Sequence, residues 1–147
     1  GRRMLISQIL KGKGAEVFTA RPEQTVAEIA AELNERRVGA VVVTDPDRHV
    51  VGIVSERDIV RAIAEAGHSG LDGPVSAHMT RDVIYAHPHE TVDQLLGRMT
   101  DRRIRHLPVC DADKRLAGIV SIGDLVKSKI AEVEAEAEGL KTYIAAG

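Results

Sequence analysis

The segment Gly118-Ile119-Val120-Ser121-Ile122-Gly123-Asp124 has a close copy earlier in the chain, Gly52-Ile53-Val54-Ser55-Glu56-Arg57-Asp58. Each copy starts with apolar residues typical of a buried strand, followed by a serine and, three residues later, an aspartate. Serine is a favoured residue immediately before a helix, so the aspartate would lie in the first helical turn. The sequence therefore predicts two strand-to-helix corners, each with a hydroxyl and a carboxylate at the start of its helix.

The two corners belong to a longer internal repeat with a constant offset. Pro22 corresponds to Pro88, and 88 minus 22 gives an offset of 66 residues. The same offset relates capping threonines, paired arginines, acidic turns and the corner aspartates, and no gap is needed. An unbroken register over this length indicates a tandem duplication. The matching positions are Thr25 and Thr91, Arg36-Arg37 and Arg102-Arg103, Asp45 and Asp111, Asp47 and Asp113, and Asp58 and Asp124.

The hydrophobic pattern gives each copy the order strand, helix, strand, strand, helix, which predicts an α+β fold. Such a small sheet, with helices on one face, cannot cover its other face alone. We therefore expect the copies to pack about a pseudo-twofold axis, with two equivalent clefts where they meet. The predicted divisions are 1–16 for an N-terminal helix and loop, 17–66 and 83–131 for the two repeats, 67–82 for a linker, and 132–147 for a C-terminal amphipathic helix.

The two terminal segments carry helical patterns of their own. A short amphipathic helix is predicted over 4–10, and Lys11-Gly12-Lys13-Gly14 is expected to break it. Near the C-terminus, Ile130, Val133, Ala137, Leu140 and Ile144 follow one another at spacings of three and four, with glutamates between them. This apolar stripe is expected to pack on the N-terminal helix or on a second subunit. A helix lying on a membrane surface would normally be basic.

Composition limits the possible partners. The chain has 147 residues, of which 44% are hydrophobic and 29% charged, and a formal net charge of -2. This charge and an aromatic content of 2% argue against nucleic-acid binding. No apolar run approaches the roughly 18 residues that cross a bilayer, so no membrane partner is expected. The single Cys110 cannot form an internal disulfide, and together these absences favour a cytoplasmic protein.

The repeated unit resembles a CBS domain, and the whole chain resembles a stand-alone protein of two tandem CBS domains. Four motifs in fixed order carry the resemblance: Arg36-Arg37-Val38-Gly39-Ala40-Val41, Gly52 to Asp58, Ile104-Arg105-His106-Leu107-Pro108-Val109, and Gly118 to Asp124. The resemblance implies a non-catalytic regulatory sensor of energy or redox state. Its ligands would be adenosyl compounds such as AMP, ADP, ATP, NAD(H) or S-adenosylmethionine, bound in the clefts between the repeats. It also implies a homodimer and a regulated protein that the sequence does not identify.

The resemblance further implies that Asp58 and Asp124 hold the ribose, since one carboxylate can accept from both hydroxyls of a diol. Ser55 and Ser121 stand at helix starts, where free amides and the helix dipole favour a phosphate. Arg57 adds a cation that the second copy lacks, so the two sites should differ. The implied nucleotide-binding residues are Phe18, Thr19, Gly39, Ala40, Val41, Ile53, Ser55, Arg57, Asp58, Ile84, Tyr85, Arg105, His106, Leu107, Pro108, Ile119, Ser121 and Asp124.

Several alternatives stay open at this stage. Ser-x-x-Asp is also an ordinary capping box, in which the carboxylate serves its own helix. A ligand-free structural or interaction protein, or a sensor of S-adenosylmethionine, would share the same motifs. Inosine-monophosphate dehydrogenases contain CBS pairs, but this chain has no room for a barrel of ~250 residues, so no catalytic residue or catalytic cofactor is expected. His78, His87 and His89 lack the further ligands of a metal set, and no metal is expected.

Overall fold

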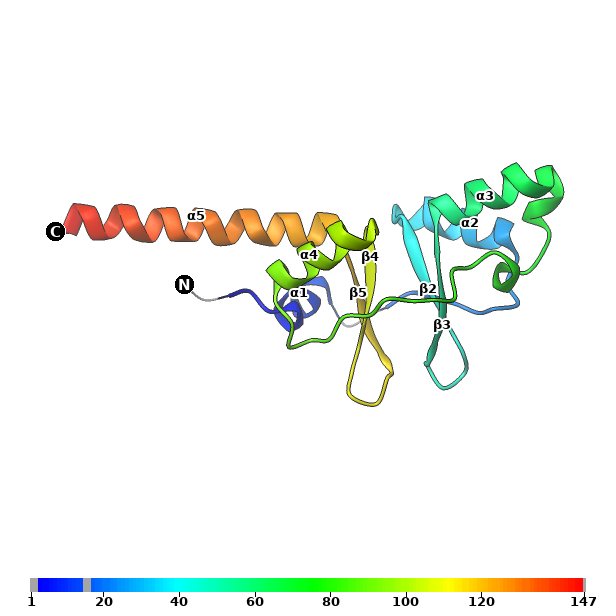
Figure 1. The fold of residues 1–147 in the computed structure, drawn as a ribbon, viewed down its shortest axis with the longest axis horizontal. Coiled ribbons are helices and arrows are strands. Elements are labelled where there is room, and N and C mark those ends of the chain that lie inside the picture. Colours follow the sequence, from blue (N-terminus) through cyan, green and yellow to red (C-terminus); the bar gives the residue numbers. More distant parts are fainter. Residues whose placement is uncertain (1–2, 15–16, 147) are drawn as a thin grey trace. The chain divides into compact units, whose positions relative to one another are not determined.

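The computed structural model describes residues 3–14 and 17–146 (Figure 1). Residues 1–2, 15–16 and 147, with the predicted division after residue 16, lie outside the described part. The elements in chain order are α1 (Ile6–Lys13), β1 (Thr19–Ala20), α2 (Val26–Arg36), β2 (Ala40–Thr44), β3 (Val50–Ser55), α3 (Glu56–Ala66), the 3-10 turns η1 (Gly67–Leu71) and η2 (Val75–Ala77), α4 (Val92–Arg102), β4 (His106–Cys110), β5 (Leu116–Ser121) and α5 (Ile122–Ala146).

These elements form two compact units. The first unit consists of Glu16–Ile84 with Cys110–Ala117, and the second consists of Gly1–Ala15, Tyr85–Val109 and Gly118–Gly147. We call them the first-repeat unit and the second-repeat unit, because each contains one copy of the strand-to-helix corner. The N-terminal helix α1 therefore belongs with the second repeat, although the first repeat follows it directly in the chain.

The predicted duplication is confirmed by the elements themselves. Helix α2 and helix α4 have the same length and start at residues 26 and 92, and strands β2 and β4 start at 40 and 106. Unusual backbone angles repeat at the same offset: Arg37 and Arg103 both have φ of 56°, and Arg48 and Lys114 have φ of 67° and 65°. Left-handed residues at the same two points show that both copies end this helix and turn this hairpin in the same way.

The core of the first-repeat unit lies between its sheet and helix α2. Strand β2 is central, parallel to β1 and antiparallel to β3, and all five of its residues are buried. Full burial agrees with its unbroken apolar run, Ala40-Val41-Val42-Val43. The buried apolar cluster is made of Ala20, Ile29, Leu33, Val41, Val43, Val54, Val75 and Met79.

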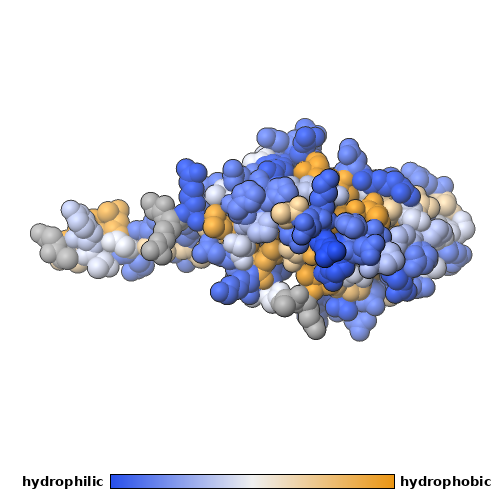
Figure 2. Space-filling model, turned by 90° about the horizontal axis from the view of Figure 1, so that it is seen from below, coloured by the Kyte–Doolittle hydropathy of each residue, from blue (hydrophilic) through white to orange (hydrophobic). Residues whose placement is uncertain are grey.

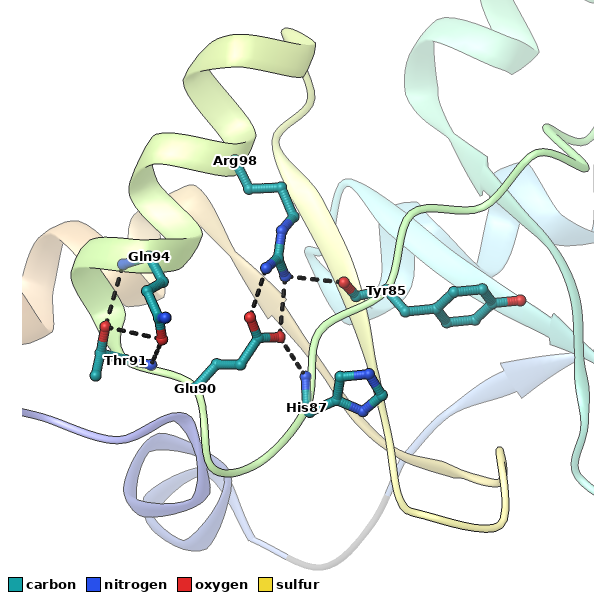
Figure 3. A network of polar contacts seen from close by, with 6 residues as sticks. All are labelled: Tyr85, His87, Glu90, Thr91, Gln94 and Arg98. Carbon is teal, nitrogen blue, oxygen red and sulfur yellow. Dashed lines mark hydrogen bonds and ion pairs between the residues drawn. The ribbon is translucent and has the colours of Figure 1, made fainter.

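The first strand that the repeat order predicts for the second copy is present only as a single bridge. Strands β4 and β5 form a two-stranded sheet, and the expected strand around Ile84 and Tyr85 is reduced to one parallel bridge between Ala86 and Val109. A side-chain clamp holds this segment instead (Figure 3): Arg98 donates to the Tyr85 carbonyl at 3.0 Å and forms an ion pair with Glu90. Glu90 also accepts from the His87 amide at 2.8 Å.

Each repeat is completed by a segment that does not belong to its own sequence copy. In the second-repeat unit, the amides of Ile6 and Ser7 donate to the carbonyls of Glu90 and Pro88, both at 2.9 Å. In the first-repeat unit, the amides of Val75 and Ser76 donate to Gln24 and Pro22, at 2.6 and 3.0 Å. The acceptors are related by the repeat offset. The segment that precedes the first copy therefore packs on the second copy in the same way as the segment that precedes the second copy packs on the first.

Glycine at the strand centre permits this packing. A Cβ on Gly52 would lie 2.5 Å from Met79 Sδ, and a Cβ on Gly118 would lie 2.6 Å from Leu10 Cδ2. Both distances are far below ordinary van der Waals contact. The glycine of the repeated motif therefore leaves room for the side chain of the segment that packs across it.

Helix α1 extends further than predicted, and the C-terminal amphipathic helix is one continuous helix with the second corner helix. Helix α1 continues through the expected break at residues 11–13 and ends at Lys13, and the next residue, Gly14, has a φ of 97°. Helix α5 runs without interruption from Ile122 to Ala146, through the predicted division at 131/132 and through Gly139. Among the helices of the described residues, none is both long and apolar enough to cross a membrane.

Candidate functional site

The two strand-to-helix corners have the same backbone connections. The amide of Glu56, the first residue of α3, donates to the Gly39 carbonyl at 3.0 Å. In the second repeat, the amide of Ile122 donates to the Arg105 carbonyl at 2.8 Å. These bonds fix each helix start beside the beginning of the neighbouring strand, β2 or β4. Residues from two separate motifs of the sequence are thereby brought together at each corner.

Both corner aspartates cap their own helices. The amides of Ser55 and Ser121 each donate at 2.8 Å to Oδ2 of the aspartate three residues later. In return the Asp124 amide donates to Ser121 Oγ at 3.1 Å, and the same reciprocal box is present at Ser55. The capping alternative is therefore confirmed. The expectation of freely available amides for a phosphate is wrong for most of this turn, because the cap and the strand carbonyl already accept from them.

Asp58 is committed to the protein through both carboxylate oxygens. Besides the Ser55 amide, Oδ2 accepts from Ser55 Oγ at 3.2 Å, while Oδ1 accepts from Thr80 Oγ1 at 3.2 Å and from Arg61. The residue is 4% exposed. Arg61 is the cation that pairs with Asp58, because residues three apart face each other on a helix.

Asp124 uses its carboxylate differently. Lys13 Nζ lies 2.6 Å from Asp124 Oδ2 and 2.9 Å from the carbonyl oxygen of Ile119. Within residues 3–14 and 17–146, no group donates to Oδ1, and the side chain is 25% exposed. Burial raises the pKa of Asp124, but the hydrogen bonds from Lys13 and Ser121 and the charge of Lys13 outweigh burial, so the pKa is lowered overall.

Lys13 and Thr80 occupy equivalent places in the two repeats. The Thr80 amide donates to the Ile53 carbonyl at 2.9 Å and its hydroxyl to Asp58, as Lys13 does to Ile119 and Asp124. The position is therefore taken by a neutral hydroxyl in the first corner, where Arg61 supplies the cation, and by an ammonium group in the second. Neither residue belongs to the duplicated motifs, so the repeat pattern alone could not identify them.

The other predicted site residues vary in what they can offer a ligand. Ala40, Val41, Leu107 and Pro108 are buried in strands, so contact through their side chains would require the strands to move. The Phe18 ring is partly buried and carries the Arg36 guanidinium 4.1 Å from its centroid. Tyr85 is 37% exposed, and its ring points away from the clamp in Figure 3. Thr19, Gly39, Ile53, Ile84, His106 and Ile119 are half-buried, and Arg57 and Arg105 are exposed.

Two groups of acidic or histidine side chains contain residue types that can bind a metal. Ligand atoms of Asp45, Asp47 and His49 lie within 4.8 Å of one another. However, Asp45 Oδ1 already accepts from the amides of Asp47 and His49, each at 2.9 Å, which shapes the hairpin turn. The rings of His87 and His89 stack with centroids 5.7 Å apart. We assign no metal to either group.

Comparison with known proteins identifies the class. The family model of the CBS domain matches residues 13–65 and 75–130, so the chain belongs to the CBS domain family. A CBS-domain containing protein from Agrobacterium tumefaciens is 44% identical, with a TM-score of 0.81 over 86% of this chain and 99% of that one. The α+β CBS-pair fold that the sequence predicted is therefore confirmed.

Two further solved structures contain ligands. A CBS domain protein from Pyrobaculum aerophilum, complexed with AMP, is 32% identical over 82% of this chain and 89% of its own, with a TM-score of 0.73. The CBS domain pair of protein MJ0100, in complex with 5′-methylthioadenosine and S-adenosyl-L-methionine, is 27% identical over 89% of this chain and 99% of its own, with a TM-score of 0.79. Ligands containing adenosine are thus found in structures similar to this chain.

Proposed function

We propose that this protein is a non-catalytic regulatory module that binds an adenine nucleotide at the corner of its second repeat. The observation that carries the proposal is that only one of the two carboxylate oxygens of Asp124 accepts hydrogen bonds from the described residues. Its Oδ2 holds the corner together, while Oδ1 faces no donor among the described residues and the side chain is partly exposed. A ribose diol supplies two hydroxyl donors, and hydrogen bonds to an ionised carboxylate are strong.

The charge beside this carboxylate favours a phosphorylated ligand. Lys13 places an ammonium group 2.6 Å from Asp124, and Arg105, whose carbonyl accepts from the start of α5, is exposed. Two cations attract a phosphate and repel the sulfonium of S-adenosylmethionine. AMP is therefore the first candidate, followed by ATP and NAD(H), and a sensor of energy or redox state would follow from these ligands.

The first repeat offers a weaker site for the same ligand. Both oxygens of Asp58 already accept hydrogen bonds, and only 4% of the residue is exposed. A ribose could reach this carboxylate only by replacing Thr80 or Arg61. We therefore assign Asp58 to stability and Asp124 to ligand binding, which refines the equal roles predicted from the sequence.

The position of Lys13 suggests how binding would be transmitted. A diol that contacts both carboxylate oxygens must share Oδ2 with Lys13 or displace it. Lys13 is the last residue of α1, so displacement would loosen the end of this helix from Ile119 and Asp124. The ligand shifts the equilibrium between attached and detached helix ends by no more than its difference in affinity for the two states.

Calorimetric titration of the full chain with AMP, ATP, NADH and S-adenosylmethionine tests the proposal. We expect AMP to bind, Asp124→Asn to abolish binding without unfolding the protein, and S-adenosylmethionine to bind more weakly than AMP. Circular dichroism of each variant verifies the fold. Absence of binding by all four compounds, or undiminished AMP binding by Asp124→Asn, would contradict the proposal.

The second candidate is a ligand-free structural or interaction module, and the two capping boxes favour it. Both aspartates already have a structural role, which an unliganded protein would retain. The same titrations distinguish the candidates, because a ligand-free module would bind none of the compounds and would lose only stability on Asp124→Asn. We propose no catalytic reaction for either candidate.

A further inference from the structure

Helix α5 exposes an apolar stripe along most of its length. Seven large apolar residues of α5 are exposed, and five of them form the stripe: Val126 at 44%, Ile130 at 53%, Val133 at 51%, Leu140 at 61% and Ile144 at 68%. The other two, Ile122 and Tyr143, lie beside it. Within the second-repeat unit, α5 continues well past α4 and α1 as a single helix (Figure 1). Apolar side chains are visible on its projecting part in Figure 2. The described residues of the chain leave this stripe uncovered.

The spacing of the stripe is that of a coiled coil. Including Ala137, the positions are 126, 130, 133, 137, 140 and 144, which alternate steps of four and three residues. This is the heptad pattern in which 130, 137 and 144 take position a, and 126, 133 and 140 take position d. Position a holds two isoleucines and an alanine, and position d holds two valines and a leucine. Isoleucine at a with leucine at d, as at 144 and 140, is the combination that favours two strands. Leu125, which is buried, and the other buried residues of the unit are not part of this stripe.

The charges beside the stripe indicate the partner. Positions g and e flank the seam, and in a parallel pair each g residue faces the e residue five positions later in the other helix. Lys129 at g would face Glu134 of a second copy, and Glu136 at g would face Lys141 of a second copy. Both contacts join opposite charges, and twofold symmetry repeats each of them. We propose that α5 forms a parallel, in-register, two-stranded coiled coil with α5 of a second copy of this chain.

Existing contacts of these charged groups do not oppose the pairing. Lys129 Nζ lies 3.0 Å from Asp93 on α4, so this lysine must divide its charge between Asp93 and the second copy. Lys141 Nζ lies 3.6 Å from Glu138 on the same helix, with both side chains 74% exposed, and such a pair is readily exchanged. Glu136 and Lys141 are consequently the pair best suited to a test. The glutamates on the remaining surface of α5 argue against an anionic membrane as the occupant.

The first test measures mass in solution. Sedimentation equilibrium of the full chain should show a dimer, and Leu140→Glu should raise its dissociation constant at least tenfold by placing charges at the seam. Ala145→Glu, which adds the same charge outside positions a and d, is the matched control and should leave the dimer unchanged. A monomeric wild-type chain would overturn the proposal, and so would a dimer that tolerates Leu140→Glu, since another surface would then hold it.

The second test determines orientation. In a parallel in-register pair, residue 144 of each copy lies at position a beside its counterpart. Ile144→Cys should therefore form a disulfide-linked dimer under mild oxidation, whereas Ala145→Cys should form much less. Glu136→Lys should weaken the dimer severalfold, and adding Lys141→Glu should restore it. Failure of Ile144→Cys to cross-link a protein that is dimeric, or failure of the double charge exchange to restore affinity, would overturn the parallel arrangement.

This proposal is independent of nucleotide binding. The variants at 136, 140, 144 and 145 lie far along α5 from Asp124 in the sequence. AMP titration of a dimer-disrupted variant and sedimentation of Asp124→Asn therefore report separately on the two proposals.

Discussion

Lys13 donates a hydrogen bond to Asp124 at one corner, and Thr80 donates one to Asp58 at the other. Each residue donates both to a carbonyl of the corner strand, Ile119 or Ile53, and to the carboxylate at the helix start. Both donors come from segments outside the duplicated motifs. The two corners therefore share a backbone but take their cation from different places, Arg61 of the same helix at Asp58 and Lys13 of α1 at Asp124.

Removing the Lys13 charge should weaken the fold modestly at neutral pH. Lys13→Met retains most of the apolar stem, and we expect a loss of about 0.5–1 kcal/mol in the free energy of unfolding, because the ion pair is partly exposed. Urea unfolding at a series of pH values measures the effect.

The same ion pair should fail in acid. The pKa of Asp124 is lowered from its ordinary value of 3.8, so the unfolded chain takes up the proton first as pH falls. The stabilisation is complete above this ordinary value and is lost as pH falls through the lower pKa of the folded state. The difference between wild type and Lys13→Met should shrink over this range. A difference that stays constant into strong acid would show that packing of the lysine stem, not its charge, is responsible.

The two corner aspartates should have unequal effects on stability. Asp58→Ala leaves the Ser55 amide and the Thr80 hydroxyl without their acceptor in a buried site, and we expect a loss of about 2–4 kcal/mol. Asp124→Ala removes a partly exposed cap and should cost about 1 kcal/mol. Thermal and urea unfolding of the two variants gives the comparison. Equal losses would mean that the second oxygen of Asp58 contributes little.

The Arg98–Glu90 clamp should be a stabilising ion pair. The Glu90 side chain is only 12% exposed, and Glu90→Gln removes the charge that Arg98 faces. We expect a loss of about 2 kcal/mol, less than for a fully buried pair because solvent reaches part of Arg98. Glu138→Gln, at a largely exposed pair, is the control and should change stability by less than about 0.5 kcal/mol.

The clamp also predicts a pH dependence. The hydrogen bond from Arg98 is the main cause that lowers the pKa of Glu90 below its ordinary value of 4.5. A carboxyl with a lowered folded-state pKa stabilises above its ordinary value and loses this contribution as pH falls below it. The wild-type advantage over Glu90→Gln should therefore be constant near neutrality and decrease in acid. If the stability difference between wild type and Glu90→Gln did not change in acid, the loss would come from the geometry of the glutamine side chain and not from the missing charge.

The sequence was sufficient for the duplicated architecture. Apolar runs predicted β2 and β3, the capping threonines marked the starts of α2 and α4, and the constant offset related the two copies. The apolar runs and the capping residues are local signals within a few positions, and the offset follows from comparing the sequence with itself. The corner serines and aspartates were located for the same reason, and their capping role is the structural alternative that the spacing suggested.

Long-range contacts were outside the reach of the same reasoning. The packing of residues 4–10 on the second repeat and of η2 on the first joins segments with little common sequence, so the repeat pattern did not predict it. Lys13 also lay in a segment expected to break the helix, although Gly12 is accommodated within α1. The contact between Arg98 and the Tyr85 carbonyl likewise joins residues 13 positions apart, which the strand and helix patterns do not relate.

Two glycines should respond to alanine in opposite ways. Gly97 lies within α4 with open space where a Cβ would be, and its counterpart in the first repeat is Ala31. Because glycine costs about 0.5–1 kcal/mol relative to alanine inside a helix, Gly97→Ala should stabilise the protein by about that amount.

Gly118→Ala should instead destabilise, since its Cβ would lie 2.6 Å from Leu10 Cδ2 and α1 must shift to admit it. The expected loss is about 1–3 kcal/mol, as for other overpacked sites, and it should fall when Leu10→Ala is added, because the smaller side chain leaves room for the new methyl group. Urea unfolding of the two single variants and the double variant measures the coupling. Strict additivity of Gly118→Ala and Leu10→Ala would mean that α1 does not pack against β5 in this way.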